Sequence, residues 1–382
     1  MFFKKNIKVC HIITSLEVGG AQTLLLEICR GLAKGEIRHF VISISNNIVL
    51  KSRFESIGCH VYTLNINTIM FFPTGLQRLI RILNEERPNI IHTWLYHSDF
   101  ISIFTSLVFK KVKVIWSIHH ASASSSYMRY STWLLIRVLA LVSYIFPEKI
   151  VYCSPFALQI HHSIGYSKGR SLLIPNGIDV NKFFPQRLVR KEFKRTLSIS
   201  EDSVLVGMVA RFSSIKGFDV FLKMASLLLQ KIPNIQFVLA GTEVCLGNSF
   251  LVNTLKSTGI ENSVHLLGER SDIDFVINGC DVIVCPSYSE SFGLVALESL
   301  ACQVPVVCSD IEAFRALDFG CFIAAVGDPV SFCEVVLNVI GMSDYDKEKL
   351  THEFRARVIN QYSLEKMLLD YETVYTQLSQ SD

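Results

Sequence analysis

The sequence predicts an α/β fold of two consecutive Rossmann-like domains, each a parallel sheet covered by helices. Short runs rich in valine and isoleucine alternate with longer stretches of helical periodicity, which is the pattern of repeated βαβ units. The alternation stops at a segment rich in turn residues, near residues 174–185, and then restarts. The length of 382 residues agrees with two domains, since about 100–200 residues per domain is usual.

The first half of the chain contains apolar runs of strand length. We expect strands at Lys8–Thr14, His39–Ser45, Cys59–Leu64, Ile90–Thr93, Val112–Ser117 and Lys149–Tyr152. Helical periodicity is clear in Gln22–Ala33 and in Thr74–Asn84, which carries an arginine-rich face. Helices between successive strands indicate parallel pairing.

The second half repeats this organisation after a charged helix at Arg187–Leu197. We expect strands at Val204–Ala210, Gln236–Ala240, Val264–Leu267, Val282–Cys285 and Val304–Ser309, and helices at Phe218–Gln230, Ser271–Cys280 and Leu294–Ala301. The domains are therefore predicted at residues 1–180 and 181–360. In such open sheets ligands bind beside the carboxyl ends of the strands, so the loops that follow strands are the candidate sites.

Composition excludes several classes of protein. Half of the residues are hydrophobic and 19% are charged, which is typical of a globular chain. The net charge of +3 is too small to indicate a nucleic-acid partner, although it suits an anionic substrate or membrane surface. The eleven cysteines form no Cys-x-x-Cys pair and lie mostly in apolar runs, so we expect reduced core thiols in a cytoplasmic protein.

Neither the N-terminus nor the most apolar stretch predicts a membrane-spanning segment. The first residues lack the cleavage site of a signal peptide, and we interpret them as a first buried strand. The apolar stretch Trp133–Phe146 is shorter than the roughly 20 residues that a membrane span needs. We interpret it as a buried helix, with a surface that touches the bilayer as the alternative.

The first candidate motif is the pair Gly19-Gly20, between the first strand and the first helix. Adjacent glycines let backbone approach a ligand, and a helix N-terminus offers free amides to phosphate. A tight turn explains the pair equally well. The Gly-x-Gly-x-x-Gly fingerprint is absent, and the next strand ends in Ser45-Asn46 without an acidic residue, which argues against a nicotinamide-dependent dehydrogenase.

The second candidate motif places two cations after a strand of the second domain. Arg211 ends the strand and Lys216 follows five residues later, just before a helix. Two cations at the carboxyl end of a strand can neutralise a diphosphate leaving group. Solvated surface charges are the alternative interpretation.

The third motif is the strongest. Glu290 precedes a helix and Glu298 lies about two turns inside it, on an otherwise apolar segment. At the helix start, the amides of Phe292, Gly293 and Leu294 can face a phosphate. A carboxylate at position 298 is costly to bury unless it is paired, and sugar hydroxyls would pair with it.

The joint order of these motifs resembles the retaining GT-B glycosyltransferases of family 4, the group 1 glycosyl transferases. The resemblance extends over almost the whole chain and is densest between Ile174 and Asp310. It implies two domains facing across a cleft, with the acceptor side in residues 1–180 and the nucleotide-sugar side in residues 181–360. It also implies a C-terminal helix, in residues 361–382, that packs back on the first domain.

The resemblance implies roles for the donor-site residues. Gly19 and Gly20 would approach the donor phosphates, and Arg211 and Lys216 would stabilise the diphosphate. Glu290 would hydrogen-bond the transferred sugar. The amides of Phe292, Gly293 and Leu294 would contact sugar or phosphate, and Glu298 would hold the ribose hydroxyls.

The resemblance also points to histidines of the first domain. His119, in Trp116-Ser117-Ile118-His119-His120, would lie near the sugar as a catalytic group. His120 is a weaker candidate. From their position after another strand, His92 and His97 are further candidates for the acceptor side, with a packing role as the alternative. Gln22 stands where many relatives have glutamate, and residues 311–318 lack the glycine-rich loop that many relatives carry, which weakens inferences about the acceptor most.

We therefore expect a retaining hexosyltransferase that acts without a metal ion or cofactor, because the candidate loops contain no Asp-x-Asp. The resemblance fits a UDP-sugar donor. It also fits a saccharide or lipid-linked acceptor of bacterial surface-polysaccharide assembly, such as O-antigen or capsule. Contact with the cytoplasmic face of the inner membrane would suit such an acceptor. Two other functions remain open: a non-catalytic nucleotide-sugar-binding subunit and a GT-B sugar-nucleotide epimerase.

Overall fold

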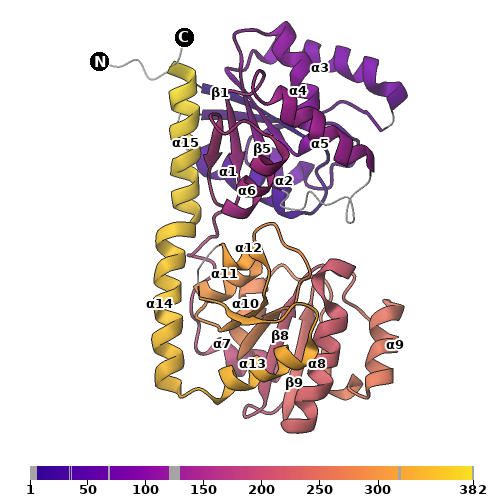
Figure 1. Cartoon of the computed structure of the whole chain (residues 1–382), viewed down its shortest axis with the longest axis vertical. Coiled ribbons are helices and arrows are strands. Elements are labelled where there is room, and N and C mark those ends of the chain that lie inside the picture. The colour runs from indigo at the N-terminus through magenta and orange to yellow at the C-terminus, as the bar shows by residue number, and fades with distance from the viewer. Residues whose placement is uncertain are drawn as a thin grey trace. The chain divides into compact units, whose positions relative to one another are not determined.

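The computed structural model describes residues 7–33, 35, 37–67, 69–119, 130–316 and 320–380. The chain divides into two compact units (Figure 1). The first unit contains Met1–Gly177 together with Glu365–Asp382, and the second contains Ile178–Leu364. The boundaries expected from the sequence are residues 180 and 360.

The first unit contains a seven-stranded sheet in the order β3-β2-β1-β4-β5-β6-β7, with every pair parallel. Its strands are β1 (Ile7–Ile13), β2 (Ile37–Ser43), β3 (His60–Thr63), β4 (Ile90–Trp94), β5 (Lys113–Ile118), β6 (Lys149–Tyr152) and β7 (Ser171–Leu173). Its helices are α1 (Gly20–Leu32), α2 (Lys51–Glu55), a 3₁₀ turn η1 (Ile69–Phe71), α3 (Phe72–Glu86), α4 (Tyr96–Val108), α5 (Tyr130–Val142), α6 (Pro155–Ile164) and α15 (Leu364–Gln380).

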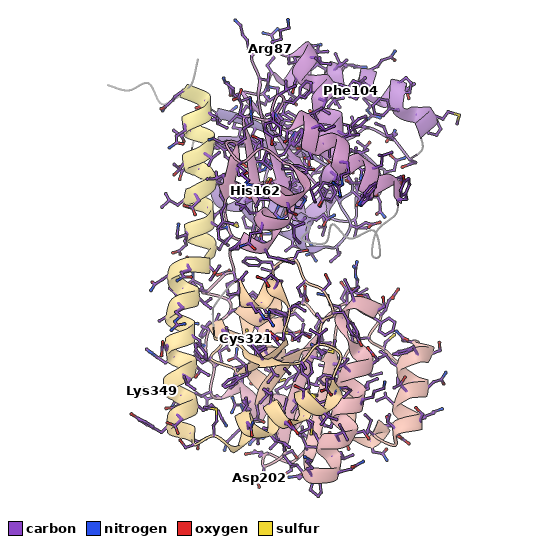
Figure 2. The ribbon with its side chains drawn as sticks, viewed as in Figure 1. Arg87, Phe104, His162, Asp202, Cys321 and Lys349 are labelled. Atoms are coloured by element: carbon purple, nitrogen blue, oxygen red, sulfur yellow. The ribbon has the colours of Figure 1, made fainter. Side chains whose placement is uncertain are left out.

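One core of the first unit lies between the sheet and α3, α4 and α5. It joins Ile12 and Ile42 of the sheet to Leu79, Ile101 and Leu139 of these three helices. The rings of Phe72 in α3 and Phe104 in α4 extend this packing, with their centroids 5.4 Å apart. Phe104 is labelled in Figure 2. These contacts hold the three helices to the sheet and leave their outer sides to solvent.

The C-terminal helix α15 also belongs to the first unit. Its Tyr371 and Tyr375 are buried, and the Tyr375 hydroxyl lies 2.7 Å from Nδ1 of His92 on β4. Gly31 of α1 makes room for the helix, since a Cβ there would lie 2.3 Å from Leu368 Cδ1. The helix therefore covers buried polar side chains of the sheet, such as His92.

The second unit contains a six-stranded sheet in the order β10-β9-β8-β11-β12-β13, again with every pair parallel. Its strands are β8 (Val204–Val209), β9 (Ile235–Ala240), β10 (Val264–Leu266), β11 (Val282–Cys285), β12 (Val306–Ser309) and β13 (Phe322–Ala324). Its helices are α7 (Val189–Thr196), η2 (Ser214–Lys216), α8 (Phe218–Lys231), α9 (Ser249–Thr258), η3 (Glu261–Ser263), α10 (Ile273–Gly279), α11 (Leu294–Ala301), α12 (Glu312–Arg315), α13 (Pro329–Gly341) and α14 (Asp344–Tyr362).

The predicted fold class, two Rossmann-like domains with parallel sheets, is confirmed. The interpretation of Trp133–Phe146 needs correction. The segment is helical through Val142, but only one side of it is buried. Ile136 and Leu139 face the core, whereas Leu134 and Leu141 are 50% and 76% exposed. The buried and exposed sides of this helix could not be told apart from the sequence, because the segment lacks the polar residues that normally mark the outer side of a helix.

Substituting Tyr375→Phe should destabilise the protein by about 1–3 kcal/mol, because it leaves a ring nitrogen of the buried His92 without its partner. Urea unfolding followed by circular dichroism measures the change. Tyr345→Phe, at a position 75% exposed in α14, is the matched control and should have almost no effect. Equal midpoints for both variants would contradict a stabilising role of the Tyr375 hydroxyl.

Candidate functional site

Two loops at the carboxyl edge of the second sheet approach closely, one after β8 and one after β11. Gly217 has a φ of +72°, and a Cβ on it would lie 2.0 Å from the carbonyl oxygen of Pro286. The amide of Tyr288 donates to the carbonyl of Ile215 over 2.8 Å. Only glycine fits at position 217 without displacing backbone, so this residue fixes how the loops meet.

The approach of the loops brings two predicted site residues together. Lys216 Nζ lies 2.6 Å from Oε1 of Glu290, and both side chains are partly buried. The hydroxyl of the buried Ser287 donates to the same carboxylate oxygen over 2.8 Å. A carboxylate held in this way can accept a ligand hydroxyl, while the ammonium group can donate to a phosphate.

Arg211, in the loop after β8, is exposed. Within the described part of the chain, no acidic side chain pairs with its guanidinium group. An unpaired guanidinium in the same loop as Lys216 offers a planar set of donors to an anion. Arg211 and Lys216 therefore offer cationic donors from one loop.

The start of α11 adds backbone donors to this edge of the sheet. Gly293 precedes the helix with a φ of +90°, and a Cβ there would lie 2.5 Å from Phe314 Cε1. Phe292 is buried, and Leu294 begins the helix. The first amides of a helix have no partner within it and attract anions. All three predicted amide donors are thus at this helix start.

Glu298 lies inside α11 and is mostly buried. Burial raises the pKa of its carboxyl group to about 7, with Asp274 acting in the same direction and Lys182 opposing it. Among the described residues no side chain hydrogen-bonds this carboxylate. A buried acceptor without a protein partner suits a ligand that supplies hydroxyl groups.

In the first unit, Gly19 and Gly20 lie where β1 leads into α1. Gly19 is extended, and Gln22 folds back beside it with its Oε1 2.6 Å from the position of an added Cβ. No atom lies within 4 Å of a Cβ built on Gly20. Packing therefore does not require glycine at position 20, and the backbone there is open to a ligand.

His119 follows β5 and stacks on Trp94, with ring centroids 4.9 Å apart and an interplanar angle of 11°. Trp94 is fully buried and its indole N–H donates to Nδ1 of His11 over 3.2 Å. The tryptophan thus holds His119 in a fixed orientation at the carboxyl edge of the first sheet. No sequence motif marked Trp94 as a positioning residue.

The other predicted histidines differ in accessibility. His92 is fully buried, with Nδ1 bonded to Tyr375 and Nε2 2.6 Å from the hydroxyl of Ser117, so it offers no surface to an acceptor. His97 is exposed in the first turn of α4. Leu95, before that turn, has a strained φ of +72°. His120 lies outside the described residues.

The side chains of His11, Cys29 and His39 form a cluster whose ligand atoms lie within 4.8 Å of one another. Burial lowers the pKa of both histidines, that of His39 to about 4. Because Trp94 donates to Nδ1 of His11, Nε2 carries the proton and donates to Nδ1 of His39 over 2.9 Å. Both nitrogens of His11 are engaged, so we interpret the cluster as a hydrogen-bonded chain rather than a metal site.

Two residues that support the site were missed from the sequence. Ser287 orients Glu290, and Asp219 accepts a hydrogen bond of 2.9 Å from the hydroxyl of Tyr288. Ser287 lies three residues before Glu290 in the same motif, which is the signal that identifies it. Asp219 lies on α8, and only the folded chain brings it to the loop.

Comparison with known families gives two matches along the chain. The family described as Glycosyltransferase Family 4 matches residues 18–182, and the family described as Glycosyl transferases group 1 matches residues 189–317. The second match includes Arg211, Lys216, Glu290 and Glu298. Together the matches span most of both units.

Individual relatives have low sequence identity to this chain but align with most of its length. The O-antigen biosynthesis glycosyltransferase WclY of Escherichia coli is 25% identical over 97% of this chain and 99% of its own. An E. coli UDP-Gal:α-D-GlcNAc-diphosphoundecaprenol α-1,3-galactosyltransferase is 24% identical over 79% of this chain and 78% of its own. The crystal structure of Anabaena HepE in complex with UDP and glucose has a TM-score of 0.83 at 18% identity, covering 97% of this chain and 100% of that one, which shows a shared fold.

None of the helices within the described ranges is both long and apolar enough to cross a bilayer.

Substituting Glu298→Gln should stabilise the protein at pH 8 by about 1–3 kcal/mol. The folded-state pKa of about 7 exceeds the ordinary value of 4.5, so the stability of the wild type falls as pH rises between these values. Glutamine mimics the neutral acid, and its advantage should therefore be several-fold smaller at pH 5. Urea unfolding at the two pH values measures it.

The exposed Glu334→Gln serves as the control and should change stability little at either pH. An equal effect of Glu298→Gln at pH 5 and pH 8 would show that burial does not raise the pKa of this carboxyl group.

Proposed function

Because the chain belongs to the group 1 glycosyl transferases of glycosyltransferase family 4, we propose that it moves a hexose from a UDP-sugar to a saccharide or lipid-linked acceptor with retention of configuration. The observation that carries this proposal is the constellation of the second unit. Lys216 and Glu290 meet beside the start of α11, while Arg211 and Glu298 have no protein partner among the described residues.

Each group of this constellation has a proposed role toward the donor. Arg211, Lys216 and the first amides of α11 bind the diphosphate, where negative charge grows as the sugar leaves. Glu290 accepts a hydroxyl of the transferred sugar. Glu298 accepts the two ribose hydroxyls, which replace the hydrogen bonds that its buried carboxylate lacks. For the first unit, we propose ligand contacts at the open backbone of Gly20 and at His119.

The proposed transfer occurs on one face of the sugar. The bond from the anomeric carbon to the β-phosphate oxygen breaks, and its electron pair leaves with UDP. An acceptor hydroxyl oxygen bonds to the anomeric carbon on the same face, and its proton passes to the departing phosphate oxygen. The cations stabilise this charge, so we propose that no metal ion is required.

The acceptor is proposed from the relatives. WclY carries the description O-antigen biosynthesis, and the galactosyltransferase acts, by its description, on a diphosphoundecaprenol-linked sugar. A glycan of a bacterial surface polysaccharide, carried on a lipid diphosphate at the cytoplasmic side of the membrane, is therefore the proposed acceptor.

An exposed apolar face on α4 and α5 supports contact with a membrane. Leu107 and Val108 end α4, and Leu134, Val138 and Leu141 line the outside of α5. Lys110 and Lys111 follow α4 directly and are exposed. Arg137 of α5 lies 5.1 Å from the ring centroid of Trp133. Apolar side chains flanked by cations suit an anionic lipid surface.

Substituting Lys216→Ala should lower turnover by about 10²–10³-fold, because a donor to the developing diphosphate charge is lost. The assay measures sugar transfer from UDP-sugars to synthetic lipid diphosphate acceptors, with the anomeric configuration of the product read by NMR. Lys223→Ala, which removes an exposed lysine of α8, should leave turnover unchanged.

A thermal-shift screen against UDP, GDP and ADP, with and without EDTA, tests the donor site directly. A shift with UDP that EDTA does not remove is expected. Binding without transfer would favour a non-catalytic subunit, and consumption of donor without acceptor would favour an epimerase.

If the Lys216→Ala variant turned over substrate as fast as the wild type, the assigned site would be contradicted.

Substituting Leu141→Glu should weaken co-sedimentation with phosphatidylglycerol vesicles several-fold, since it places a like charge at the apolar face. Leu188→Glu, at an exposed position of the second unit, is the matched control. Wild-type protein that fails to bind such vesicles at low salt would remove the membrane part of the proposal.

A further inference from the structure

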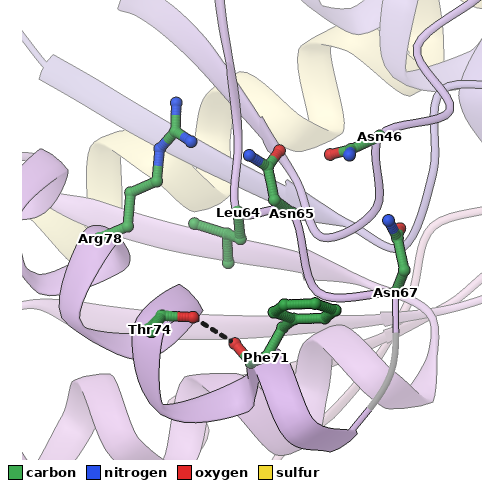
Figure 3. Close-up of a pocket in the computed structure, with 7 residues that line it drawn as sticks. All are labelled: Asn46, Leu64, Asn65, Asn67, Phe71, Thr74 and Arg78. Atoms are coloured by element: carbon green, nitrogen blue, oxygen red, sulfur yellow. Dashed lines mark hydrogen bonds between the residues drawn. The ribbon is translucent and has the colours of Figure 1, made fainter.

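A pocket of about 360 Å³ lies beside the carboxyl ends of β2 and β3 in the first unit (Figure 3). It is lined by Asn46, Leu64, Asn65, Asn67, Phe71, Thr74 and Arg78. A second hollow of about 570 Å³ continues along α3 and shares Thr74 and Arg78 with the first. Volumes of this order accommodate small organic ligands, and the edge of the sheet is where ligands bind in such folds.

The walls of the pocket are held by the fold. The amides of Leu64 and Ile66 donate to the carbonyls of Ser43 and Ile44 over 2.8 and 2.9 Å, which ties the loop after β3 to the end of β2. Gly75 of α3 lies against this loop, and a Cβ on it would be 2.3 Å from Ile66 Cγ1. These contacts fix the start of the loop after β3 and pack it against α3 beside the pocket.

Three carboxamides enter this pocket. The side chains of Asn46, Asn65 and Asn67 are exposed and make no hydrogen bond within the described part of the chain. Asn65 has a φ of +61°, a conformation that asparagine tolerates better than most residues. In Figure 3 the amides lie above the ring of Phe71, which is 44% exposed. Amides that donate and accept, beside an apolar ring, match the hydroxyls and carbon face of a sugar.

Arg78 adds a positive charge at one side of the pocket. The neighbouring Arg81 is paired with Glu85 at 2.9 Å, and Glu86 is held by Lys8 and Tyr62. Arg78 has no acidic partner among the described residues, and it lines both hollows. A free guanidinium fork binds phosphate or carboxylate through two parallel hydrogen bonds.

We propose that this pocket binds an anionic sugar unit of the acceptor, with the asparagine amides on the hydroxyls and Arg78 on the anionic group. This inference rests on the proposed function, and it names the acceptor class: a sugar that carries a phosphate or a carboxylate. A sugar linked to a lipid diphosphate and a uronic acid within a glycan share this chemistry.

Binding of four probes to the full chain tests the proposal by titration calorimetry: GlcNAc 1-phosphate, glucuronic acid, neutral GlcNAc and inorganic phosphate. At least one anionic sugar should bind more tightly than neutral GlcNAc and phosphate, and the preferred one identifies the source of the anion. Arg78→Gln should weaken that binding about tenfold or more while leaving neutral GlcNAc nearly unchanged.

Two further variants keep the test independent of folding. Asn65→Asp tolerates the same backbone conformation and should also weaken binding of the anionic sugar, because it adds a like charge. Arg53→Gln, at an exposed arginine of α2, is the matched control and should not change binding. The proposal would be overturned if the wild type and the three variants bound the anionic sugar with equal affinity. It would also be overturned if the wild type bound neither anionic sugar.

The thermal shift with UDP separates this proposal from the proposed function. Arg78→Gln should retain the wild-type shift with UDP, because Arg78 belongs to the first unit and the donor groups named above belong mainly to the second. Loss of sugar binding with UDP binding intact supports the pocket. If the wild type did not bind UDP but Arg78→Gln still weakened binding of the anionic sugar, the proposed function would be contradicted and the pocket would still be supported.

Discussion

The candidate donor site depends on the close approach of two loops at Gly217 and the carbonyl of Pro286. Neither Lys216 nor Glu290 alone forms a site, and the two meet only because the backbone beside Lys216 carries no side chain. Ser287 and the Tyr288–Asp219 hydrogen bond then hold the second loop in place. The charged groups are therefore positioned before any ligand arrives, which is the arrangement that favours stabilisation of charge in a transition state.

The fold was predictable from the sequence because buried parallel strands are nearly continuous apolar runs, and β8, β9 and β11 follow this pattern closely. The exposed side of α5 was not predictable, since its apolar residues satisfy no periodic pattern. Periodicity alone did not reveal α4 either, between the strands expected at Ile90–Thr93 and Val112–Ser117. Its start at Tyr96 follows a leucine of positive φ, and such a backbone leaves no signal in composition.

Within the site, the groups found from the sequence are those that share one motif or one strand end, such as Glu290 and Glu298. Apart from Ser287, which lies in the same motif as Glu290, the groups missed are brought together by tertiary structure alone. Trp94 contacts His11 and His119 from neighbouring strands, and Asn46 lies beside Asn65 because β2 pairs with β3. His92 shows the converse error. Its position at a strand end resembled a site, but α15, far along the chain, covers it.

The place of α15 in the chain has a consequence for the order in which the protein is made. Every strand of the first sheet is synthesised before the second unit begins, yet the helix that buries His92 is synthesised after the second unit ends. During translation the nascent first unit therefore exposes a partly apolar, histidine-lined surface. It completes its fold only when Tyr371 and Tyr375 have emerged from the ribosome, so this surface is available to chaperones for as long as the second unit is being translated.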